Sequence, residues 1–125
     1  MRKAERDLQM ARLGAADPDP PKDEVCFHCQ QLSEKYLKAL LQESGSVIHR
    51  THDLEALFTQ LLPLFPSLKP LKRGLAFLSD FAVETRYPGK NVRTRQMEAA
   101  LRWADRVRQE CRSLLGIKTP GKKTP

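Results

Sequence analysis

The sequence predicts an all-α fold, an up-and-down helical bundle of about five helices. Apolar residues recur at three- and four-residue spacing in five stretches, which is the period of a helix with one buried face. No stretch alternates apolar and polar residues with period two, so we predict no β-sheet. Proline and glycine residues separate the stretches. At 125 residues, the chain is long enough for one domain with a single core and too short for two.

The stretch 23–43 is the expected central helix of this bundle. Its apolar face carries Val25, Cys29, Leu32, Tyr36 and Leu40, and it is widened by Cys26, Leu37 and Leu41. A face that covers half the helix or more must be buried on two sides, as in the middle of a bundle. Because the rest of the chain offers little to cover so wide a face, we also expect a homodimer.

The other helices follow from their apolar faces and their breaks. The first covers residues 1–13, with Ala4, Leu8, Ala11 and Met10 facing inward and Gly14 as its stop. The central helix begins near Pro20 and ends at Ser44 and Gly45. Later helices are expected at 51–62, capped by Thr51, at 68–85, and at 92–115. We expect residues 1–115 to form the single domain and residues 116–125 to be a disordered basic tail.

The positive charge is concentrated in the last third of the chain. The net charge is +7, but residues 1–85 have 11 basic and 12 acidic side chains, whereas residues 86–125 have 11 basic and three acidic ones. Such a surface can attract RNA, a nucleotide phosphate or an acidic partner. A solvated helix face followed by a basic tail explains the same numbers without any ligand.

Three motifs occur in a characteristic order: FHCQQLSEKYLKALL at 27–41, THDL at 51–54, and AVETRYPG at 82–89. In this order and spacing the chain resembles bacterial and archaeal HEPN proteins, a family of nucleotide-binding helical domains, over nearly its whole length. The resemblance implies a helical bundle that usually dimerises. It also implies work beside a minimal nucleotidyltransferase as partner, frequently as a toxin–antitoxin pair. Many members of the family are metal-independent ribonucleases.

The ribonuclease motif of that family is absent from this sequence. In those ribonucleases an arginine is followed by a histidine, with four to six residues between them. None of His28, His49 and His52 has an arginine at that distance before it. We therefore expect a non-catalytic protein that binds a nucleotide or a partner. The alternatives are a ribonuclease toxin with an altered active site and a dimeric interaction module with no ligand.

Four residues are the candidate binding groups. His28 and Lys35 share a polar edge of the central helix with Gln31, and this edge is expected to line a groove or an interface. Arg86 and Tyr87 end the fourth helix, where a guanidinium can hold a phosphate and a phenol can stack on a base. The alternative for these two is a purely structural helix end.

Two further clusters have weaker functional interpretations. Asp80 and Glu84 form an acidic pair that could hold a metal or orient a base, although pairing with nearby arginines is the simpler explanation. Cys26 and Cys29 form a CxxC, but a zinc site needs about four ligands and only Cys111 and distant histidines remain. We expect structural thiols, and no metal or cofactor. The sequence has no apolar run long enough for a membrane span and no secretory signal, so the expected location is the cytoplasm.

Overall fold

The computed structural model describes residues 1–48, 50–82 and 91–117. These residues contain five α-helices, one 3₁₀-helix and no strand, which confirms the predicted all-α class. The helices are α1 (Arg2–Ala15), α2 (Lys22–Glu43), α3 (Leu54–Leu61), η1 (Pro66–Leu71), α4 (Lys72–Ser79) and α5 (Thr94–Leu115).

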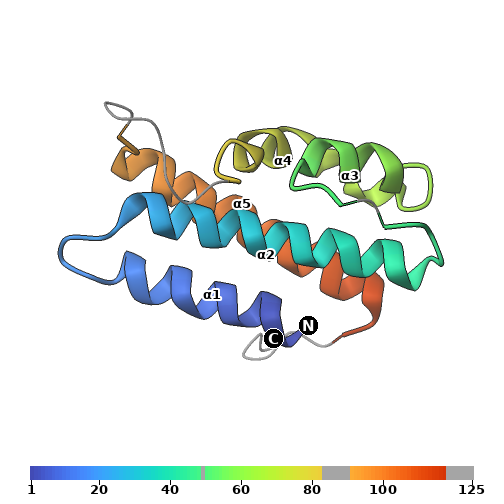
Figure 1. The fold of residues 1–125 in the computed structure, drawn as a ribbon, viewed down its shortest axis with the longest axis horizontal. Helices are drawn as coiled ribbons and strands as arrows, with labels where there is room; N and C mark the ends of the chain where they lie inside the picture. The colour runs from blue at the N-terminus through green and yellow to red at the C-terminus, as the bar shows by residue number, and fades with distance from the viewer. Residues whose placement is uncertain (49, 83–90, 118–125) are drawn as a thin grey trace, which may run out of the picture.

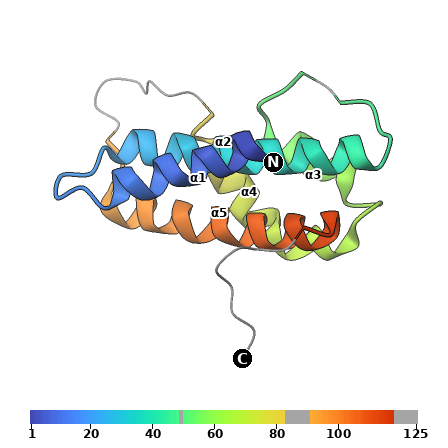
Figure 2. The same cartoon turned by 90° about the horizontal axis from the view of Figure 1, so that it is seen from below.

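Helix α2 lies at the centre of the molecule, as predicted, and contacts each of the other α-helices. α1 runs back along one side of it, α5 crosses behind it, and α3 and α4 cover the remaining side (Figures 1 and 2). All eight predicted core residues of α2 are buried, Tyr36 and Leu40 completely. The wide apolar face is thus covered within one chain and gives no reason of its own to expect a dimer.

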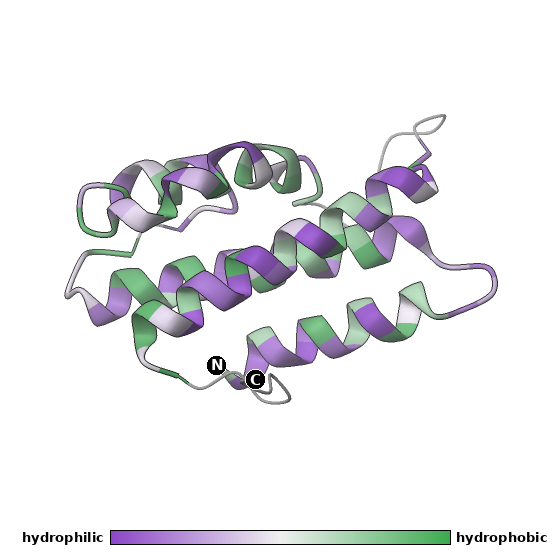
Figure 3. Cartoon of the chain, turned by 180° about the vertical axis from the view of Figure 1, so that it is seen from behind, coloured by the Kyte–Doolittle hydropathy of each residue, from purple (hydrophilic) through white to green (hydrophobic). Residues whose placement is uncertain are grey.

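Each helix has one apolar and one polar side, so hydrophobic residues (green) and hydrophilic residues (purple) recur in turn along the helices in Figure 3. On α1, Ala4, Leu8 and Ala11 are buried as predicted, but Met10 is 43% exposed, so its inward assignment was wrong. Gly14 does not end α1, which continues to Ala15. A Cβ atom at Gly14 would lie 2.9 Å from Cγ2 of Val25, so the glycine allows α1 to approach α2 closely.

Helix α3 begins three residues later than predicted, with Asp53 rather than Thr51 as its cap. The Asp53 carboxylate accepts from the backbone N–H groups of Glu55 and Ala56, at 3.0 and 3.4 Å. Thr51 instead accepts from the N–H of Asp53 at 3.0 Å and so stabilises the turn before the helix. Both threonine and aspartate favour the N-cap position, so the sequence alone did not decide which of the two residues caps α3.

The helix predicted at 68–85 is divided into two. η1 contains Pro70, which has no N–H to donate to an α-helical hydrogen bond, and regular α-helix starts only at Lys72. α4 then ends at Ser79, six residues before the predicted end. Of the five apolar residues that the spacing predicts on its buried face, Leu68, Leu71, Leu75 and Leu78 are all buried, whereas Ala82 lies past the end of α4 and is only partly buried.

Helix α5 matches the prediction closely and ends at Gly116, whose φ of 73° is left-handed. Of the apolar residues that the helical spacing predicts on its buried face, Met97, Ala100, Ala104, Val107 and Cys111 are buried, whereas Leu101 and Leu114 are only partly buried. Arg108 and Arg112 are buried as well, which the sequence did not indicate. Most of the predicted tail, residues 118–125, lies outside the described residues.

Candidate functional site

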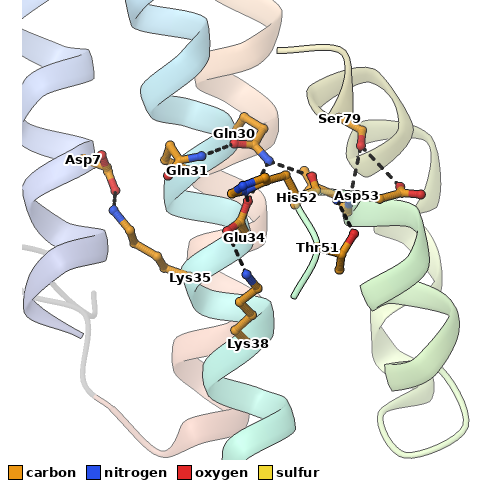
Figure 4. Close-up of polar contacts among 11 residues, drawn as sticks. Asp7, Gln30, Gln31, Glu34, Lys35, Lys38, Thr51, His52, Asp53 and Ser79 are labelled. Carbon is orange, nitrogen blue, oxygen red and sulfur yellow. Dashed lines mark hydrogen bonds and ion pairs between the residues drawn. The ribbon is translucent and has the colours of Figure 1, made fainter. Parts of the chain in front are cut away.

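The polar edge predicted on α2 faces α1, and one carboxylate joins its two candidate residues. Asp7 of α1 is buried and accepts from both His28, whose Nδ1 lies 2.9 Å from Oδ1, and Lys35, whose Nζ contacts Oδ2 (Figure 4 shows Lys35). The side chains of His28 and Lys35 are still 23% and 33% exposed. The structure therefore places both residues together at the α1–α2 boundary, each with one side toward solvent.

A groove of about 370 Å³ opens beside Lys35, between the start of α1 and the second half of α2. We call it the α1–α2 groove; it is lined by Met1, Arg2, Lys3, Ala4, Lys35, Lys38, Ala39, Gln42 and Ile48. Its four charged side chains are all cations. His28 does not line it. The groove can thus attract an anion by charge, and Ala39 and Ile48 supply apolar surface beside the cations.

Lys38 belongs to a second network, centred on the buried carboxylate of Glu34. Glu34 accepts from Lys38 Nζ at 3.0 Å, from His52 Nδ1 at 2.9 Å and from Gln30 Nε2 at 3.1 Å (Figure 4). Gln30 also donates to the backbone oxygen of His52 at 3.0 Å. Burial raises the pKa of Glu34, but the hydrogen bonds from His52, Lys38 and Gln30 outweigh it and lower the pKa overall.

The Glu34 network gives His52 a structural role. Both its ring and its backbone are bonded to α2, so it fixes the segment that leads into α3. The His52 side chain is 69% exposed. Its Nδ1 is bonded to the Glu34 carboxylate. No arginine in the described part of the chain forms an ion pair with Glu34.

A third network lies inside the bundle and joins α1, α2 and α5. Arg108 donates to both oxygens of Glu5, from Nε at 2.9 Å and from Nη2 at 2.7 Å, and Tyr36 donates its hydroxyl hydrogen to the same carboxylate. Arg112 donates to the Tyr36 oxygen at 3.0 Å. The hydrogen bond from Arg108 lowers the pKa of Glu5, and burial raises the pKa of Tyr36. These groups hold the helices together, and none of them lines the α1–α2 groove.

Comparison with protein families supports the resemblance. The family model for the HEPN domain matches residues 1–114. The chain belongs to the HEPN domain family. A search of curated proteins and a search of solved structures each found no match. The all-helical bundle described above agrees with this membership.

The cysteines of this HEPN domain are buried in its core. Cys26, Cys29 and Cys111 form no disulfide bond with one another. Burial raises the pKa of the Cys29 thiol above its ordinary value and that of Cys111 to about 12, so both are protonated at neutral pH. Among the described residues, no group of three or more His, Cys, Asp or Glu side chains is arranged to hold a metal ion. None of the described helices combines the length and apolarity needed to cross a bilayer.

The remaining predicted residues lie at or beyond the end of α4. Arg86, Tyr87 and Glu84 are outside the described residues, so their relation to Lys35 stays a prediction. Asp80 is exposed and forms the C-terminal cap of α4. Because α4 ends at Ser79, the helical spacing from which the acidic pair was predicted does not extend past Asp80.

The largest groove of those described was not predicted from the sequence. It has a volume of about 550 Å³ and is lined by Glu55, Lys69, Pro70, Lys72, Arg73, Ala76 and Trp103. We call it the Trp103 groove. Its cations come from η1 and α4 and its indole from α5, so no single stretch of sequence displays it. The signal available was the lone tryptophan on a helix that also carries Arg102 and Arg106.

Proposed function

We propose that this HEPN protein is a non-catalytic partner of a minimal nucleotidyltransferase, and that its α1–α2 groove binds the phosphates of a nucleotide. The observation that carries the proposal is the charge of the groove. Arg2, Lys3, Lys35 and Lys38 line it, and none of the carboxylates in the described part of the chain does. The proposed role in a toxin–antitoxin pair, and in a cytoplasmic setting, rests on the family resemblance.

The two lysines of the groove are held in place before any ligand arrives. Lys35 is bonded to Asp7 and Lys38 to Glu34, so both ammonium groups have lost part of their conformational freedom. Each ammonium has three donors, and its contact with the carboxylate uses one. A phosphate oxygen can take a further donor on the solvent side. His28, which shares Asp7 with Lys35, orients that carboxylate and acts through it.

Arg86 and Tyr87 are proposed to complete the site from the segment that follows α4. In this proposal the guanidinium holds a phosphate and the phenol stacks on the base. The absence of the Arg–His ribonuclease spacing supports a binding role over a catalytic one. The homodimer is likewise proposed from the family, in which dimers are common.

Calorimetric titration with the four nucleoside triphosphates tests the nucleotide proposal. Wild type should bind at least one of them. Lys35→Gln should weaken that binding about ten- to a hundredfold, because a charge-assisted hydrogen bond contributes about 1.5–3 kcal/mol. Arg12→Gln is the matched control: it removes one exposed cation from α1 outside the groove and should leave the affinity unchanged. No binding to wild type, or equal loss in both variants, would refute the site.

The partner proposal has its own test. A minimal nucleotidyltransferase encoded beside this gene, purified separately, should form a complex of defined stoichiometry with this chain in size-exclusion chromatography. A neighbouring nucleotidyltransferase that shows no complex at micromolar concentration would contradict the pairing.

A further inference from the structure

We propose that the Trp103 groove is a second binding site, for single-stranded RNA, on the side of the molecule formed by η1, α4 and α5. This inference goes beyond the proposed function, because it concerns a different surface from the α1–α2 groove. The shape of the groove, its charges and the placement of its indole support this second site.

The groove combines an apolar floor with a cationic rim. Pro70, Ala76 and the indole of Trp103 provide apolar surface, while Lys69, Lys72 and Arg73 carry positive charge. All three cations are exposed, and none forms an ion pair with a described carboxylate. Among the residues that the structure describes, Glu55 is the single acidic one in the lining. A base can lie against such a floor while its phosphates contact the rim.

The indole is fixed where a ligand can reach it. A Cβ atom at Gly74 would lie 2.1 Å from Cε3 of Trp103, so the ring occupies space that only a glycine leaves free. The guanidinium carbon of Arg106 lies 4.6 Å from the ring centroid, a cation–π contact that holds this arginine beside the groove. Trp103 is only partly buried. Rigid aromatic and cationic groups are the usual components of a surface that binds single strands.

The positive charge continues past the groove along α5, and this favours a long, repeating anion. Arg95, Arg102 and Arg106 are exposed at spacings of seven and four residues, so they follow one side of the helix. At 1.5 Å per residue, the row from Arg95 to Arg106 is roughly 16 Å long. A mononucleotide would contact only part of this row, whereas an RNA strand places a phosphate at every nucleotide. Unpaired strands are favoured over duplexes because a base must be free to reach the floor.

The chain has one tryptophan, so its own fluorescence reports on this groove. We expect a twelve-nucleotide single-stranded RNA to quench the Trp103 emission of the unmodified protein at low salt. With about five cations in contact with phosphates, log K should fall with log salt at a slope of about −3.5. Affinity should then drop about 100-fold between 50 and 200 mM salt.

A double variant and a matched control locate the binding. Lys72→Gln with Arg73→Gln should weaken RNA binding about ten- to a hundredfold and reduce the slope to about −2. Arg6→Gln with Arg12→Gln removes two exposed charges from α1 and should change both far less. Circular dichroism checks that both double variants keep the helical content of wild type. Lys35→Gln should leave the Trp103 response unchanged, so failure of this proposal is distinguishable from failure of the nucleotide site.

Four outcomes would overturn the proposal. The first is RNA binding that leaves the Trp103 emission unchanged. The second is an equal loss of affinity in the two double variants, which would mean that overall charge alone attracts RNA. The third is quenching by a twelve-residue oligo-glutamate but not by RNA, which would assign the groove to an acidic protein partner. Absence of any RNA binding at 50 mM salt would also contradict it.

Discussion

Arg108 on α5 donates two hydrogen bonds to the carboxylate of Glu5 on α1, across 103 positions of sequence. α1 and α5 each pack on α2, and this ion pair joins them across it. The side chain of Arg108 is 7% exposed and that of Glu5 is 30% exposed. Water therefore screens the pair on the Glu5 side only, and the arginine would be left buried if the carboxylate were removed.

Glu5→Gln should consequently destabilise the bundle. The amide keeps the shape of the side chain but provides only one acceptor oxygen and no charge for Arg108. We expect the free energy of unfolding to fall by about 2 kcal/mol, the usual cost of losing hydrogen bonds to a charged group. Urea titration measures it. Glu98→Gln, which neutralises an exposed carboxylate on α5, is the control and should change it by less than about 0.5 kcal/mol.

The Glu34 network predicts a loss of stability in acid. The folded-state pKa of Glu34 is lowered from the ordinary value of 4.5, so its contribution is present above pH 4.5 and declines as the pH falls through the lowered value. Thermal melts between pH 7 and pH 3 should show a smaller acid-induced decrease in Glu34→Gln than in wild type. Equal decreases would mean that other carboxylates determine the acid sensitivity.

The contact between Gly74 and Trp103 predicts a sign reversal between two backgrounds. Gly→Ala inside a helix ordinarily stabilises by up to about 1 kcal/mol. Here the new methyl group would overlap the indole, and overpacking of this kind costs about 1–3 kcal/mol, so Gly74→Ala should destabilise. In a Trp103→Ala background the same change should be neutral or stabilising. A destabilisation of equal size in both backgrounds would show that the indole is not what the methyl group meets.

The proposed homodimer predicts a mass of about 29 kDa, twice the 14.3 kDa of one chain, in sedimentation velocity at micromolar concentration. Because the core of α2 is covered within one chain, dimerisation must use surface groups instead. Exposed apolar residues such as Leu13 and Leu64 are available for it. A single species of about 14 kDa across that concentration range would contradict the dimer.

The sequence predicted the helices well because each has a regular apolar face. The face of α2 was correct throughout, and that of α5 was correct except for the partly buried Leu101 and Leu114, since leucines and alanines at helical spacing leave little choice of what to bury. The boundaries were less accurate where two residues could perform the same task, as Thr51 and Asp53 can at the start of α3. Pro70 divided η1 from α4 although the leucine spacing continued across it.

Contacts between distant helices could not be read from local patterns. The polar edge of α2 was visible in the sequence, but Asp7, which joins His28 to Lys35, lies 21 and 28 positions away from them on another helix. Arg108 and Arg112 resembled surface residues because their carboxylate and phenol partners are on α1 and α2. The Trp103 groove was missed for the same reason, since its lining comes from α3, η1, α4 and α5.

The proposal that the α1–α2 groove holds a nucleotide is tested most directly by following the amide chemical shifts of the protein during a nucleotide titration. Each of the four nucleoside triphosphates is titrated into ¹⁵N-labelled protein, and at least one should shift the amides of Arg2, Lys3, Lys35 and Lys38, with saturation at a common Kd. The same residues should respond far more weakly in Lys35→Gln. No shifts with any of the four at millimolar concentration, or shifts confined to the residues around Trp103, would contradict nucleotide binding in this groove.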